Sequence, residues 1–87
     1  MSNGRVLIVD DEPQIRRALR TALAGHAYEV ETAEDGDVAL VQIATWQPDV
    51  VVLDLVMPGQ DGFAVVRDVR EWSQVPIIVL SARGQET

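Results

Sequence analysis

Residues 49–53 read DVVVL, in which four aliphatic, mostly β-branched side chains follow one aspartate. Continuous apolar runs of this kind are typical of strands that are buried on both faces of a parallel sheet. Two further runs have the same character, RVLIV at residues 5–9 and PIIVL at residues 76–80. A fourth run, YEVET at residues 28–32, alternates in polarity, which predicts a strand at the edge of the sheet.

Helical patterns separate these strands. Pro13 suits the first turn of a helix, and Gly25 supplies its end. A second helix is predicted to open at Asp35 and to end before Pro48, and a third is predicted to be capped by Asp61. The predicted apolar stripes are Ile15, Leu19 and Leu23 in the first helix, Leu40, Ile43 and Ala44 in the second, and Phe63, Val66 and Val69 in the third.

The order β-α-β-α-β-α-β shows no repeat, low-complexity segment or linker. Because crossovers between parallel strands are right-handed, this order predicts an α/β fold with an open, doubly wound parallel sheet. A length of 87 residues fits one small domain, which we expect to span residues 1–87.

The amino-acid composition argues against several classes of function. Fourteen acidic side chains face seven basic ones, and the formal charge of −7 argues against nucleic-acid binding by this chain. The seven cations are all arginine, and cysteine is absent. No apolar run is long enough to span a membrane, and the first residues do not resemble a signal peptide. We therefore expect a cytoplasmic protein with no membrane partner.

Three carboxylates follow strands of the predicted sheet. Asp10 and Asp11 come directly after residues 5–9, and Asp54 comes directly after residues 49–53. In open α/β sheets, sites form beyond the carboxyl ends of the strands, so the three side chains converge if these strands are neighbours. Three close negative charges call for a hard cation with oxygen ligands, which predicts a Mg²⁺ site. The alternative is that these residues are helix caps or solvated loop charges.

Two further groups are predicted at the same rim. In the segment DLVMPGQDG at residues 54–62, Pro58 and Gly59 favour a turn and Gly62 relaxes the backbone before the next helix. Such a loop can direct the backbone carbonyl of Val56 toward a metal ion. Ser81, directly after residues 76–80, is placed where its hydroxyl could hydrogen-bond an oxygen added to Asp54.

The motifs VLIVDDE, VVLDLVMPGQDG and PIIVLSA, in this order and spacing, resemble those of response-regulator receiver domains of two-component systems. The segments IRRALRTALAG and REWSQVPIIVLSAR are similar to the potassium-transport regulators of the OmpR/PhoB class. The resemblance implies a CheY-like fold and a role in transcription regulation. It implies that Asp54 accepts a phosphoryl group from a sensor histidine kinase, that Asp10, Asp11 and the Val56 carbonyl bind Mg²⁺ with Asp54, and that Ser81 is the switch hydroxyl. It also implies that the first helix, with Arg16, Arg17 and Arg20 on a solvated face, docks the kinase.

The chain departs from the family pattern at its end. Thr87 precedes the fourth helix, fifth strand and fifth helix of the family, together with its phosphate-contacting lysine and its switch aromatic. We therefore expect a partial receiver domain without an output domain, whose strand at 76–80 is an exposed apolar edge that drives homo-oligomerisation.

Two alternatives to a phosphoacceptor stay open from the sequence. One is a receiver-fold fragment that cannot be phosphorylated and acts as an interaction or oligomerisation module. The other is a hydrolase of the haloacid-dehalogenase type, which the spacing of Asp10, Asp11 and Glu12 disfavours because that family uses Asp-x-Asp. As a receiver domain, the chain would catalyse only its own phosphorylation and dephosphorylation.

Overall fold

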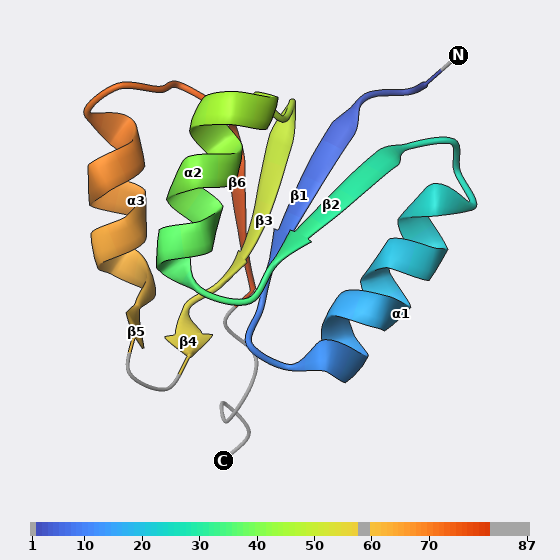
Figure 1. The fold of residues 1–87 in the computed structure, drawn as a ribbon, viewed down its shortest axis with the longest axis horizontal. Helices are drawn as coiled ribbons and strands as arrows, with labels where there is room; N and C mark the ends of the chain where they lie inside the picture. Colours follow the sequence, from blue (N-terminus) through green and yellow to red (C-terminus); the bar gives the residue numbers. More distant parts are fainter. Residues whose placement is uncertain (1, 58–59, 81–87) are drawn as a thin grey trace.

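The computed structural model describes residues 2–57 and 60–80 of the chain (Figure 1). The elements are, in order, β1 (Arg5–Val9), α1 (Pro13–Ala24), β2 (Glu29–Ala33), α2 (Gly36–Trp46), β3 (Val50–Asp54), β4 (Val56–Met57), β5 (Gln60–Asp61), α3 (Gly62–Arg70) and β6 (Ile77–Leu80). Within the described ranges, none of the helices has the length and apolar content that a membrane span requires.

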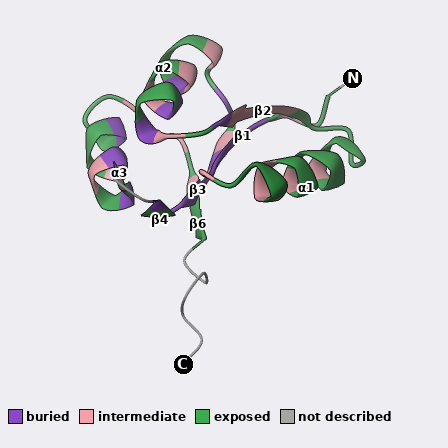
Figure 2. Ribbon diagram, turned by 60° about the horizontal axis from the view of Figure 1, so that its bottom comes forward, coloured by how far each residue is buried: buried purple, intermediate pink, exposed green. Residues whose placement is uncertain are grey.

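A four-stranded parallel sheet forms the centre of the molecule. Its strand order is β2-β1-β3-β6, and β4 and β5 form a separate antiparallel ribbon. Helix α1 lies against β1 and β2 on one face, whereas α2 and α3 lie side by side on the other face (Figure 1; Figure 2). This arrangement confirms the predicted doubly wound α/β fold, and it confirms β2 as an edge strand.

The main core lies between the sheet and the layer of α2 and α3. Leu7 of β1 and Leu53 of β3 are almost fully buried in one cluster with Ile43 of α2 and Val69 of α3. Because side chains alternate along a strand, the neighbouring residues of β1 point to the opposite face, toward α1. That second layer is thinner, since α1 has no fully buried residue and its apolar stripe is only half-buried.

Two helix residues that the sequence predicted to face the core are exposed instead. Phe63 is 62% exposed, and Ala44 is also exposed. Helix α3 instead buries Gly62, Val65 and Val69, which are three and four residues apart and so share one face. Phe63 is one position after the first of these, and a helix turns by about 100° per residue, so its ring points away from the sheet. The same one-position offset from the buried Ile43 moves Ala44 outward.

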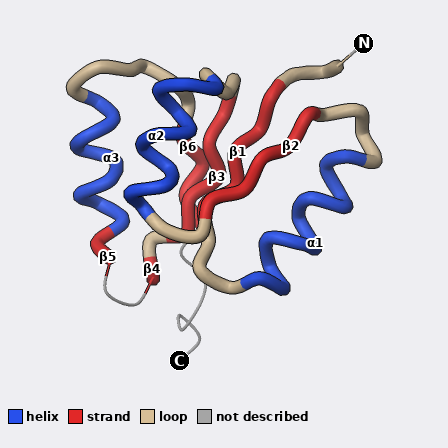
Figure 3. The backbone as a smooth tube through the Cα atoms, viewed as in Figure 1, coloured by secondary structure: helices blue, strands red, loops and turns tan. Residues whose placement is uncertain are grey.

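The parallel register sets the carboxyl edge of the sheet, which Figure 3 shows at the lower ends of the strands. Val9 of β1 pairs with Leu53 of β3, and Asp54, the last residue of β3, pairs with Leu80 of β6. The strands β1, β3 and β6 therefore end next to one another.

Candidate functional site

Three carboxylates meet where β1 and β3 end. Asp10, Asp11 and Asp54 each offer one carboxylate oxygen, and these oxygens all lie within 4.8 Å of one another. Asp10 is 3% exposed and Asp54 is 2% exposed, while Asp11 is half-buried. The predicted convergence is thus present, and burial of Asp10 and Asp54 argues against a reading as solvated loop charges.

The two buried carboxylates are oriented by the backbone that follows them. The amide N–H of Glu12 donates to Asp10 Oδ1 at 2.9 Å, and the amide N–H of Val56 donates to Asp54 Oδ1 at 2.9 Å. In both cases an aspartate bonds to the amide two residues later, which is the pattern of an Asx turn. The chain thus turns away sharply after each strand and leaves the carboxylates at the edge of the sheet.

The segment after Asp54 folds back tightly on itself. Val56 pairs with Asp61 across the β4–β5 ribbon, and Asp61 Oδ1 accepts a hydrogen bond of 3.0 Å from the Phe63 amide at the start of α3. A β-carbon at Gly62 would lie 2.7 Å from the α-carbon of Leu55, which is closer than any side chain allows. Glycine is therefore required here for close backbone approach, whereas the sequence suggested backbone flexibility.

The site is suited to a small divalent cation. With Mg–O distances of about 2.1 Å, oxygen ligands in an octahedron are about 3.0 Å apart when adjacent and about 4.2 Å apart when opposite. The three carboxylate oxygens lie within 4.8 Å of one another, so small side-chain shifts would bring them onto one ion. All three are carboxylates, the hard oxygen donors that this ion prefers, and together they supply the charge to hold it. The residues present therefore fit a Mg²⁺ ion without a change of the fold.

Two further groups are predicted to belong to the rim of the site. Val56 lies beside the cluster, because its amide bonds Asp54, and its side chain is half-exposed. Ser81 lies outside the described residues, as do Pro58 and Gly59 of the predicted turn.

Sequence reasoning missed one contact of the site. Arg16 was assigned to a solvated face, but it is half-buried, and its Nη1 donates to the carbonyl oxygen of Asp10 at 2.7 Å. The arginine therefore holds the backbone from which Asp10 projects. The sequence did contain a sign of this contact, because Arg16 lies in the first turn of the helix that begins shortly after Asp10.

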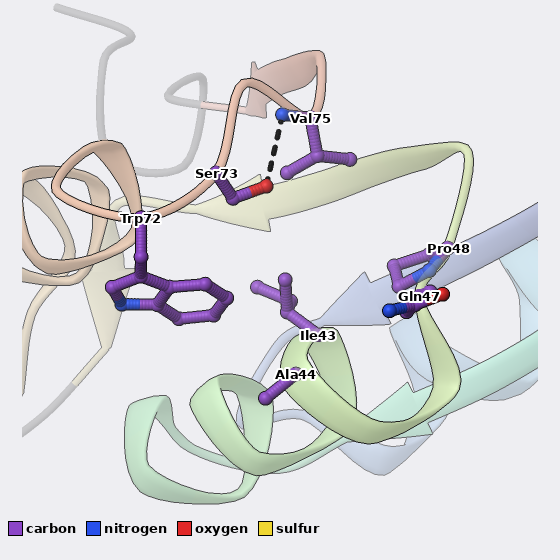
Figure 4. Close-up of a pocket in the computed structure, with 7 residues that line it drawn as sticks. All are labelled: Ile43, Ala44, Gln47, Pro48, Trp72, Ser73 and Val75. Atoms are coloured by element: carbon purple, nitrogen blue, oxygen red, sulfur yellow. Dashed lines mark hydrogen bonds between the residues drawn. The ribbon is translucent and has the colours of Figure 1, made fainter.

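A separate groove lies between the C-terminal ends of α2 and α3, away from the acidic cluster. It has a volume of about 310 Å³, and Trp72, Ile43 and Pro48 are among the residues that line it (Figure 4). Ser73 Oγ in its wall accepts a hydrogen bond of 3.1 Å from the amide of Val75 (Figure 4). No predicted site residue lies in this groove.

Comparisons with protein families and with individual proteins point to the same family. The profile described as "Response regulator receiver domain" matches residues 6–87. The chain is 52% identical over 82 residues to the KDP operon transcriptional regulatory protein KdpE of Escherichia coli, covering 94% of this chain and 36% of that protein. It is 45% identical over 82 residues to the transcriptional regulatory protein ResD of Bacillus subtilis, covering 94% of this chain and 34% of that one. The chain thus spans about a third of the length of these relatives.

Solved structures agree with this result. The response regulator TrrA of Thermotoga maritima, in complex with Mg²⁺-BeF, has a TM-score of 0.83 at 41% identity, over 94% of this chain and 70% of that one. The chemotaxis response regulator CheY4 of Vibrio cholerae has a TM-score of 0.82 at 36% identity, over 98% of this chain and 75% of that one.

Proposed function

This chain belongs to the family of response regulator receiver domains, and from that premise we propose that it is a phosphoacceptor with Asp54 as the accepting residue. The donor would be the phosphohistidine of a sensor histidine kinase. The single observation that carries this proposal is the convergence of Asp10, Asp11 and Asp54 within 4.8 Å at the ends of β1 and β3.

The proposed reaction is an in-line displacement at phosphorus. A carboxylate oxygen of Asp54 forms the new P–O bond while the bond from phosphorus to the histidine nitrogen breaks, which leaves an acyl phosphate on Asp54 and returns the histidine to its free form. The Val56 amide, at 2.9 Å from Asp54 Oδ1, holds the side chain in one orientation for this attack. Hydrolysis of the acyl phosphate by water would end the signal, so the chain catalyses only its own phosphorylation and dephosphorylation.

Asp10, Asp11, Asp54 and the backbone carbonyl of Val56 would hold Mg²⁺. A bound cation supplies positive charge to the phosphoryl oxygens and offsets the repulsion between phosphate and carboxylates. The TrrA structure, which contains Mg²⁺-BeF, supports this part of the proposal, since TrrA is 41% identical to this chain.

The output of the proposed reaction would be a change in regulation of transcription. The relatives are transcriptional regulators, which supports a cytoplasmic location. In this proposal, Ser81 moves toward the phosphoryl oxygens as the switch hydroxyl. The charge of −7 supports the view that this part of the protein does not itself bind nucleic acid.

Phosphoryl uptake by the parent chain tests the proposal. After incubation with acetyl phosphate and Mg²⁺, intact-mass spectrometry should show one added phosphoryl group, which hydroxylamine removes because acyl phosphates react with it. Without a divalent cation, uptake should fall steeply, because the three carboxylates then repel the donor. A folded chain that gains nothing with Mg²⁺ would instead support the alternative of an interaction module without phosphorylation.

That alternative draws on one specific observation, the exposed residues of β6. Among the described strands, β6 has β3 as its one neighbour, and Ile78 is 55% exposed and Val79 is 43% exposed. An apolar edge with unpaired backbone groups can pair with another chain. We therefore include homo-oligomerisation through β6 in the proposal, whether or not Asp54 is phosphorylated.

Sedimentation velocity checks this oligomer. We expect the parent chain to sediment faster as its concentration rises, and we expect Val79→Pro to abolish this dependence because proline removes an N–H that edge pairing uses. The control is Val41→Ala, which changes another exposed valine and should behave like the parent. Alanine is used there because Val41 lies in a helix, which proline would break. A parent chain that stays monomeric at all concentrations would rule out pairing through β6.

A further inference from the structure

A groove between α1 and β2 gathers three arginines outside the acidic cluster. Its volume is about 250 Å³, and it is lined by Pro13, Arg16, Arg17, Arg20 and Thr32. The four α1 residues are spaced i, i+3, i+4 and i+7, which places them on one face of the helix. Thr32 reaches the groove from β2, the strand that α1 packs against. The groove is therefore built by two elements that are fixed relative to each other.

Backbone carbonyls hold two of the three guanidinium groups. Arg16 Nη1 donates to the carbonyl of Asp10 at 2.7 Å, and Arg20 Nη2 donates to the carbonyl of Val30 at 3.4 Å. Over residues 2–57 and 60–80, none of the three lining arginines forms an ion pair, and the ion pair that is found there joins Arg5 and Glu29. Each guanidinium has five N–H donors, so most of the donors in the groove are available to a ligand.

The charge of the groove opposes that of the molecule. Three positively charged side chains line a groove of about 250 Å³ on a chain whose formal charge is −7. Like charges that line one groove repel one another, and a bound anion relieves that repulsion. Guanidinium forks match pairs of phosphate oxygens, and the Thr32 hydroxyl adds a neutral donor.

We propose that this groove binds a small molecule that carries a phosphate group, a site separate from the Asp54 phosphoacceptor. The lining favours such a ligand over a protein segment, because the residues that anchor protein interfaces are mainly aromatic side chains in desolvated pockets, and the groove contains none. The volume also suits a group of the size of pyrophosphate better than a larger ligand. Arg17, Arg20 and Thr32 would donate to the phosphate oxygens, while Arg16 stays bonded to Asp10.

Titration with pyrophosphate, followed by ¹H–¹⁵N NMR spectra, tests this site. The buffer is stripped of divalent cations, so that the acidic cluster repels the probe. We expect saturable shifts of the amide peaks, concentrated at residues 14–20 and 30–32. The variant Arg17→Gln/Arg20→Gln should raise the apparent Kd at least about tenfold, because it removes two side chains that donate charge-assisted hydrogen bonds. Glutamine is a good helix former, so the helix should be retained. Arg16 is left in place because of its bond to Asp10.

The matched control is Arg67→Gln/Arg70→Gln on α3, which removes the same charge on the opposite face of the sheet from the groove (Figure 1; Figure 2). It should change the apparent Kd less than about twofold, as expected for distant surface charges. Equal weakening by both double variants would mean general attraction to positive charge and would overturn the proposal. Tighter binding of hexaglutamate than of pyrophosphate would also overturn the proposal, because it would indicate that the groove binds an acidic protein segment. Both variants change exposed helix positions, so their spectra should retain the dispersion of the folded parent.

Discussion

The Asp54→Asn variant is expected to gain no phosphoryl group under conditions that modify the parent chain, and to resist unfolding better than the parent in metal-free buffer. The first effect follows because an amide oxygen is a poor nucleophile at phosphorus. The second follows because Asn keeps an Oδ1 that can accept the 2.9 Å bond from the Val56 amide, while it removes one of three negative charges within 4.8 Å. We expect the free energy of unfolding to rise by about 1–2 kcal/mol.

Intact-mass spectrometry and urea unfolding, on the same preparation, measure the two effects. A rise in stability together with complete loss of phosphoryl uptake would exclude misfolding as the cause of the loss. Addition of Mg²⁺ should then reverse the order of stability, because only the parent retains all three carboxylates. At a Mg²⁺ concentration about 100-fold above Kd, the parent should gain about 2.7 kcal/mol.

Asp61→Asn is the matched control for Asp54→Asn. It makes the same chemical change in an exposed aspartate that caps α3 and lies outside the acidic cluster. Asn and Asp are equally good N-caps, so phosphoryl uptake and stability should both stay near those of the parent. A phosphoryl group on Asp54→Asn would place the acceptor elsewhere, and a loss of stability in that variant would contradict repulsion within the cluster.

Leu53→Ala is expected to remove about 2–5 kcal/mol from the free energy of unfolding, which is a large part of the stability of so small a domain. Leu53 is 1% exposed in the central part of the sheet and belongs to the cluster that joins the sheet to α2 and α3. Removal of a fully buried leucine side chain costs about 2–5 kcal/mol, from lost burial and from the cavity left behind. Small domains have a total stability of about 5–15 kcal/mol, and a chain of 87 residues is at the low end.

Urea unfolding followed by circular dichroism measures this loss. Val41→Ala, at a helix position that is 62% exposed, is the control and should change stability by less than about 0.5 kcal/mol. A Leu53→Ala chain that unfolds within about 1 kcal/mol of the parent would mean that the cluster around β3 is not the main source of stability.

The acidic site was largely predictable without coordinates. Aspartates directly after two buried strands must lie at the carboxyl edge of a parallel sheet. The sequence made their convergence conditional on the two strands being neighbours, and the structure pairs β1 with β3. With that pairing, Asp10, Asp11 and Asp54 converge as the conditional prediction expected. The role of each residue in phosphoryl transfer is a separate matter and stays a prediction.

What the sequence by itself determined is the four strands of the parallel sheet, the three helices and the edge of the sheet at which the carboxylates gather; the β4–β5 ribbon was not among the predicted strands. These follow from apolar runs, caps and turn residues, which act over a few neighbouring positions. Only the tertiary structure decided that Phe63 points outward, that Gly62 is needed for contact with Leu55, and that Arg16 bonds the Asp10 carbonyl. It also decided that Thr32 closes a groove against the arginines of α1. The physical reason is that each of these depends on how one packed element is rotated and placed against another, and local side-chain patterns do not specify that placement closely enough.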